Sequence, residues 1–148
     1  IHPSTVADLA WHPKKQSLAV AHYGGVRLWN IETLKPGPDF EYPVSILTVR
    51  ISPDGRWLAT GNQDSSLRVW PMEGGEPLQM SGYPTKIRRL AWSHDSRFLA
   101  CASEDQATIW DFKGQGPEGT TPAMALAAAG KVTDLAFHPL QAGLLAFG

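Results

Sequence analysis

The stretch ILTVRISPDGRWLATGNQDSSLRVW, residues 46–70, decides the fold. It contains three apolar runs separated by two short polar segments, residues 52–55 and 62–65. Ser, Pro, Asp, Asn and Gly favour tight turns, whereas runs of β-branched and aromatic residues favour strands. The stretch therefore predicts three consecutive strands joined by two turns.

The same pattern recurs along the chain with a period of about 40 residues. Trp29, Trp70 and Trp110 each close the third run of a unit, and they are 41 and 40 residues apart. In the first two units a fourth run follows, at residues 39–42 and 77–81. Four strands in about 40 residues is the signature of a β-propeller blade. We therefore expect an all-β fold, a partial β-propeller.

Four units are expected within one domain spanning residues 1–148, at about residues 1–42, 43–82, 83–127 and 128–148. The last unit is incomplete and has only two strands, so the chain forms an arc of about three and a half blades, part of a seven-bladed ring. Such an arc leaves a bare sheet face at each end, and bare apolar faces favour association. We expect the remaining blades of a longer chain, or self-association through the open ends, to cover them.

The second run of each complete unit is apolar or small at every position, as in residues 18–21, 58–61 and 99–102. A strand with one face in water would alternate between apolar and polar residues. These strands are therefore expected to be buried on both faces, as they are when blades stack against one another.

Composition excludes several classes of partner. The chain has 13 Lys and Arg against 14 Asp and Glu, a net charge of −1, so no overall attraction to nucleic acid is expected. The longest apolar run, residues 123–129, is far too short to span a membrane. The single cysteine, Cys101, cannot form an internal disulfide. A reducing, cytoplasmic location is therefore expected.

The turns and strand ends of these units resemble the WD40 repeat. The matching segments are Ser52–Gly55, Leu58–Gly61 and Val69–Trp70 in one unit, and Leu99–Asp105 and Ile109–Asp111 in the next. The resemblance covers nearly the whole chain and implies a WD40-type propeller. Residues 21–26 and 80–84 also resemble segments of bacterial WD40 proteins.

WD40 blades share a buried hydrogen-bonded set: a His before the first strand, a Ser or Thr in the second, an Asp in the next turn, and the closing Trp. The resemblance implies that this repeated structural role falls on Trp29, Asp64, Trp70, Asp105 and Trp110. At the His position the four units carry His2, Tyr42, Tyr83 and Ala128. No unit therefore has the complete set, and stability should depend more on apolar packing.

No catalytic residue, metal site or cofactor is expected. His12, His94 and His138 occupy the same turn in three units, so they point to different places around the ring and do not converge on a metal. Cys101 lies in an apolar strand, where a thiol is buried and inert. No Gly-rich phosphate loop opens a helix.

One basic cluster, Lys86 with Arg88 and Arg89, interrupts the even charge distribution. Strand alternation should send Arg88 and Arg89 to opposite faces, which weakens the patch as a nucleic-acid site. We expect these residues to lie at the rim or along the channel.

One face carries the loops before each first strand and after each second strand, and loops on a rigid ring are well suited to binding. It would present Tyr23, Tyr42, Gln63, Tyr83, Lys86, Glu104 and Lys131. Tyr42 and Tyr83 have an alternative interpretation, that they fill the family His position. The expected function is a non-catalytic scaffold that binds a protein or peptide on this face. The alternative is an enzyme or small-ligand protein that uses the mouth of the central channel.

Overall fold

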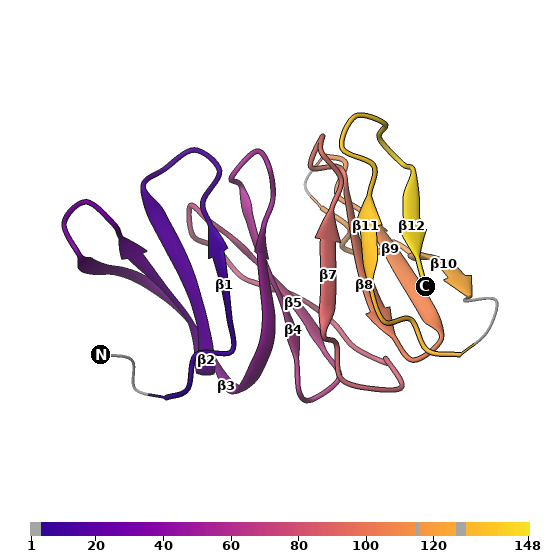
Figure 1. The fold of residues 1–148 in the computed structure, drawn as a ribbon, viewed down its shortest axis with the longest axis horizontal. Coiled ribbons are helices and arrows are strands. Elements are labelled where there is room, and N and C mark those ends of the chain that lie inside the picture. The colour runs from indigo at the N-terminus through magenta and orange to yellow at the C-terminus, as the bar shows by residue number, and fades with distance from the viewer. Residues whose placement is uncertain (1–3, 115, 127–129) are drawn as a thin grey trace.

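The computed structural model describes residues 4–114, 116–126 and 130–148. These residues form strands and turns and contain no helix, so none long and apolar enough to cross a membrane occurs among them. The sheets stand side by side with their strands upright and spread into an open arc (Figure 1). The structure is the predicted partial β-propeller, without closure into a ring.

The strands follow one another with short connections. They are β1 (Asp8–Trp11), β2 (Ser17–Asn30), β3 (Lys35–Ile51), β4 (Trp57–Asn62), β5 (Leu67–Pro71), β6 (Leu78–Met80), β7 (Arg89–Trp92), β8 (Phe98–Ser103), β9 (Gln106–Asp111), β10 (Ala123–Leu126), β11 (Leu135–Phe137) and β12 (Leu145–Phe147). All pairings between them are antiparallel.

The long strand β2 is folded back on itself. A straight strand of 14 residues would span about 46 Å. However, the N–H of Ile31, just beyond one end, donates a hydrogen bond to the carbonyl of Gln16, just before the other, at 2.9 Å. The reversal falls at Gly24 and Gly25, whose φ angles of +98° and +141° are accessible mainly to glycine. β2 therefore supplies two strands of the first blade.

β3 links two blades. Its first part, to Ser45, pairs with β2, and its last part, from Ile46, pairs with β4. It is therefore the outer strand of the first blade and the inner strand of the second. With β2 and β3 each counted twice, the chain has the expected pattern. Within the part of the chain that the structure describes, three blades have four strands, and the fourth has β11 and β12.

Successive blades pack face against face, which confirms that the second strands are buried on both sides. All six residues of β4 are buried, and so are Leu99, Ala100 and Cys101 of β8. We call the face that a blade turns toward its predecessor the front face. It carries Val49 in the second blade and Leu90 in the third, each packed in a cluster with small residues of the blade before.

The predicted Ser-Pro-Asp-Gly turn is held by its own side chains. Ser52 Oγ donates to Asp54 Oδ1 at 2.6 Å and accepts the N–H of Trp57 at 3.0 Å. The corresponding turn of the third blade reaches across, because Ser96 Oγ accepts the N–H of Asp54 at 2.8 Å. These turns therefore stabilise both the blades and their contact.

Candidate functional site

The loops that the sequence assigns to one binding face do lie together. The turns joining β4 to β5 and β8 to β9, and the segments leading into β7 and β11, all lie along the lower edge of Figure 1. We call this edge the loop face. Tyr23, Gln63, Lys86 and Lys131 are exposed, and Tyr42, Tyr83 and Glu104 are partly buried.

A cleft of about 390 Å³ opens on the loop face between the third and fourth blades. It brings together three of the predicted residues, Lys86, Glu104 and Lys131, and leaves out Tyr23 and Gln63. Lys131 Nζ lies 3.6 Å from Glu104 Oε2. We call this the basic cleft, because its lining carries four cationic side chains and one anionic side chain.

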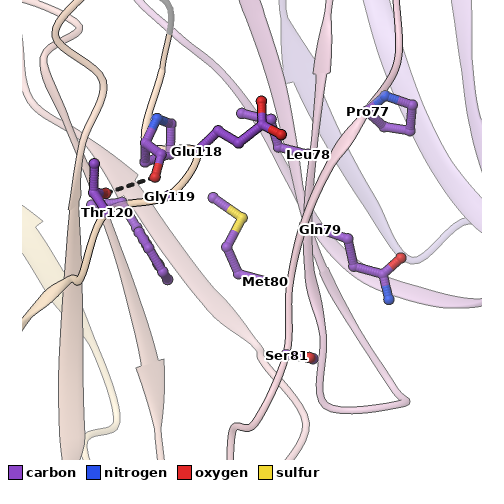
Figure 2. Close-up of a pocket in the computed structure, with 10 residues that line it drawn as sticks. Pro77, Leu78, Gln79, Met80, Ser81, Glu118, Gly119 and Thr120 are labelled. Atoms are coloured by element: carbon purple, nitrogen blue, oxygen red, sulfur yellow. Dashed lines mark hydrogen bonds between the residues drawn. The ribbon is translucent and has the colours of Figure 1, made fainter.

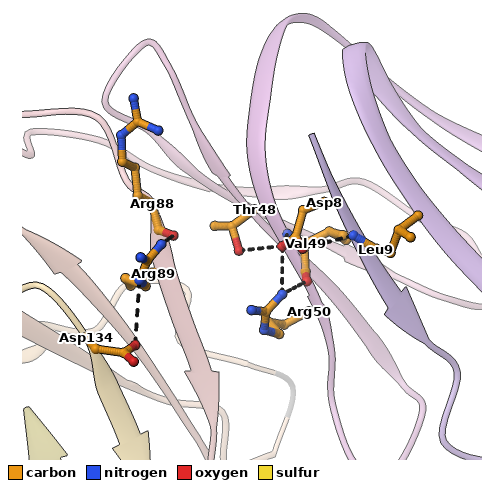
Figure 3. Close-up of polar contacts among 8 residues, drawn as sticks. All are labelled: Asp8, Leu9, Thr48, Val49, Arg50, Arg88, Arg89 and Asp134. Carbon is orange, nitrogen blue, oxygen red and sulfur yellow. Dashed lines mark hydrogen bonds and ion pairs between the residues drawn. The ribbon is translucent and has the colours of Figure 1, made fainter. Parts of the chain in front are cut away.

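The other two cations of the basic cleft are Arg88 and Arg89. Their side chains extend away from each other, and Arg89 turns toward Asp134 of the fourth blade (Figure 3). The expected divergence is therefore present, but it does not separate the two residues, since both line the same cleft. The strand β7 begins only at Arg89, so the pleat does not set the direction of Arg88.

Tyr42 occupies the position of the family His and makes an internal contact. Its hydroxyl donates to Asp64 Oδ2 at 2.6 Å, and the guanidinium of Arg68 lies 4.3 Å from the centre of its ring. Burial tends to raise the pKa of Asp64, but hydrogen bonds from Ser66 and Tyr42 outweigh it and hold that pKa below its usual value. This geometry supports the structural interpretation of Tyr42.

Tyr83 is likewise turned inward. Its hydroxyl oxygen accepts a hydrogen bond from Trp110 Nε1 at 2.9 Å, and its ring packs on the core between the second and third blades. Burial raises the pKa of Tyr83 far above the usual value.

Burial also raises the pKa of the Cys101 thiol to about 12, so this thiol stays protonated at neutral pH. Asp105 is exposed, and its side chain takes no part in the contact between Tyr83 and Trp110.

An interaction that the sequence analysis did not find joins the first two blades (Figure 3). Asp8 Oδ2 accepts hydrogen bonds from Thr48 Oγ1 at 2.9 Å, from the N–H of Val49 at 3.0 Å and from Arg50 Nη1 at 2.7 Å. Burial tends to raise the pKa of Asp8, but these hydrogen bonds and the charge of Arg50 hold it below the usual value. The sequence held one indication of this contact between blades, because Asp8 and Thr48 occupy the same position in their units.

A second cleft, of about 380 Å³, lies at the outer rim between β6 and residues 117–120 (Figure 2). Met80 points into it, and Thr120 Oγ1 donates to the carbonyl of Pro117 at 2.6 Å. Pro117 is buried, so the Gly- and Pro-rich segment that follows β9 packs partly on the blade. None of the predicted binding residues lies in this cleft.

Two of the three histidines of the repeated turn, His12 and His138, have a local structural role. The Nδ1 atom of His12 accepts the N–H groups of Lys14 and Lys15, both at 3.1 Å, and Nδ1 of His138 accepts two backbone N–H groups in the same way. Burial, with the nearby lysines, lowers the pKa of His12. His2 and Ala128, the other residues at the family His position, lie outside the described residues.

The sequence profile of the WD domain, G-beta repeat (WD40) matches residues 39–71 and 75–111. The two matches run from the outer strand of the first blade through β5 and from just before β6 through β9. These two segments are therefore WD40 repeats. No curated protein matches the chain. WD40 repeats generally mediate protein–protein interactions, and WD40 proteins are typically non-catalytic scaffolds.

Proposed function

We propose that this chain is a non-catalytic scaffold that binds a protein or peptide partner through its loop face, in the cytoplasm. The observation that carries the proposal is the convergence of Lys86, Glu104 and Lys131 around one cleft, supported on packed blades. Binding by loops already held in place loses little conformational entropy. Tyr23, 62% exposed on the same face, adds an aromatic side chain of the kind enriched at interface cores.

The loops around the basic cleft are fixed before any partner arrives. Ser103 Oγ accepts the N–H of Thr85 at 3.2 Å and donates to the carbonyl of Thr85 at 3.0 Å. The N–H of Val132 donates to the carbonyl of Glu104 at 2.7 Å. The segments leading into β7 and β11, which form the two walls of the cleft, are therefore both hydrogen-bonded to the end of β8 or the turn that follows it. This supports a preformed site.

The test is affinity capture with matched variants on the two faces. The immobilised chain is compared with Tyr23→Ala, Gln63→Ala and Lys86→Ala, and with Lys14→Ala in a turn on the opposite face. Proteins that bind through the loop face should be lost with the first three variants and retained with Lys14→Ala. The proposal is wrong if the captured proteins are unchanged in all loop-face variants.

We propose in addition that the front face of the first blade is covered by another sheet of the same kind. Leu9 and Trp11 on this face are 50% and 64% exposed. Leu90 and Leu135, at the position of Leu9 in later blades, are 4% and 7% exposed because a preceding blade covers them. The covering sheet would come from further blades of a longer chain or from a second copy.

A further inference from the structure

We propose that the basic cleft receives an acidic, extended segment of the partner protein, an inference that rests on the proposed function. The cleft lining carries Lys86, Arg88, Arg89 and Lys131 against Glu104 alone, in a chain whose net charge is −1. The cleft therefore has a local excess of positive charge. A local concentration of one sign attracts and orients a partner of the opposite sign.

Two of the four cations are free to bind. The side chains of Lys86 and Arg88 are exposed, and neither makes a hydrogen bond or ion pair with any residue that the structure describes. An ammonium and a guanidinium two positions apart in the segment before β7 offer donors to two carboxylates of one chain. Arg88 can also bind a carboxylate through two parallel N–H groups.

The other two cations already have partners. Arg89 lies 3.6 Å from Asp134 and donates hydrogen bonds to the carbonyl oxygens of Thr133 and Arg88, both at 3.1 Å. Lys131 lies 3.6 Å from Glu104, and its side chain is 75% exposed. Exposed ion pairs of this length contribute little to stability. Lys131 can therefore exchange its contact with Glu104 for a carboxylate of a bound segment at little cost, whereas Arg89 stays in place and adds its charge to the cleft.

The residues that line the cleft favour a peptide over a nucleic acid as the ligand. Val132 and Ala102 are buried beneath it, which provides apolar contact for small side chains between the acidic ones. None of the described residues that line the cleft is aromatic, and Tyr83 nearby is turned inward to Trp110. Single-stranded nucleic acid is usually bound by stacking its bases on aromatic rings, and this site lacks them.

The probe is a fluorescein-labelled synthetic peptide of alternating Glu and Val residues, titrated with the 148-residue chain by fluorescence anisotropy. The Kd should rise at least about tenfold in the Lys86→Gln, Arg88→Gln double variant and should also rise with ionic strength. The double variant Lys14→Gln, Lys15→Gln, with the same change in charge on the opposite face, should bind as the unaltered chain does.

Several outcomes would overturn the inference: equal binding of a peptide with Gln in place of Glu, unchanged binding by the Lys86→Gln, Arg88→Gln variant, or tighter binding of a single-stranded oligonucleotide. A failure of this inference can be distinguished from a failure of the proposed function. If affinity capture still depends on the loop face while the acidic peptide does not bind, only the inference about the partner's charge is wrong.

Discussion

Leu9 and Val49 occupy the same position of the inner strand in the first two blades, but Leu9 is 50% exposed and Val49 is fully buried. The difference comes from the neighbouring sheet. Val49 packs with Ala19 and Ala21 of the blade before it, whereas nothing covers Leu9 among the described residues. The first blade therefore presents the same apolar face that the next blade buries.

This exposed face should drive self-association of the 148-residue chain. Light scattering should give a mass above the 16.1 kDa of one chain, and the double variant Leu9→Gln, Trp11→Gln should lower it toward that value. The control is Leu34→Asn, which removes an apolar side chain that is 74% exposed outside this face, at a positive φ that Asn tolerates. A stable monomer of the unaltered chain would contradict the prediction.

Trp70→Ala should lower the free energy of unfolding by about 3–5 kcal/mol. Trp70 is 6% exposed and packs edge-on against Phe40 of the first blade, with ring centroids 5.9 Å apart. Chemical denaturation measures the loss, and Tyr23→Ala, at an aromatic side chain that is 62% exposed, should cost much less. A loss below about 1 kcal/mol for Trp70→Ala would mean that the contact between blades has been misplaced.

Tyr42→Phe should destabilise the fold by about 1 kcal/mol, because it leaves Asp64 without the hydroxyl that donates to it at 2.6 Å. Tyr23→Phe removes the same atom from a side chain that is 62% exposed and should leave the free energy of unfolding nearly unchanged. Equal values for the two variants in chemical denaturation would show that Tyr42 does not fill the family His position in this protein.

Asp8 should make the contact between the first two blades sensitive to acid. Its pKa in the folded chain lies below the usual value for an aspartate, so its stabilising contribution is present above that usual pKa and is lost as the pH falls through the folded-state pKa. The stability difference between the unaltered chain and Asp8→Asn should therefore shrink in acid. Asp105→Asn, at an exposed carboxylate, is the control. A difference for Asp8→Asn that does not change with pH would contradict the prediction.

Much of the fold could be predicted from the sequence, because blade formation depends on local pattern. The 40-residue period, the turns at residues 52–55 and 62–65, and the second strands of apolar or small residues each correspond to an observed feature. Hydrophobic alternation and turn chemistry act over a few residues, so they can be read directly from the order of residues.

The candidate site was only partly predictable. Its loops were placed on the correct edge, but the sequence did not show that Lys86, Glu104 and Lys131 share a cleft while Tyr83 faces inward. Which neighbour a loop residue meets depends on how two separate blades pack. The hydrogen bond from Thr48 to Asp8, which are 40 residues apart in the sequence, also depends on how two blades pack.

The sequence by itself determined the strands, their turns and the repeat, since these follow from short-range preferences of the backbone and of apolar side chains. Only the tertiary structure decided which polar groups are paired and which are left to bind. Pairing depends on distances between blades, and these are set by the packing of small residues such as Ala19 and Ala59. Lys86 and Arg88 therefore could be identified as the free cations of the cleft only after the blades were in place.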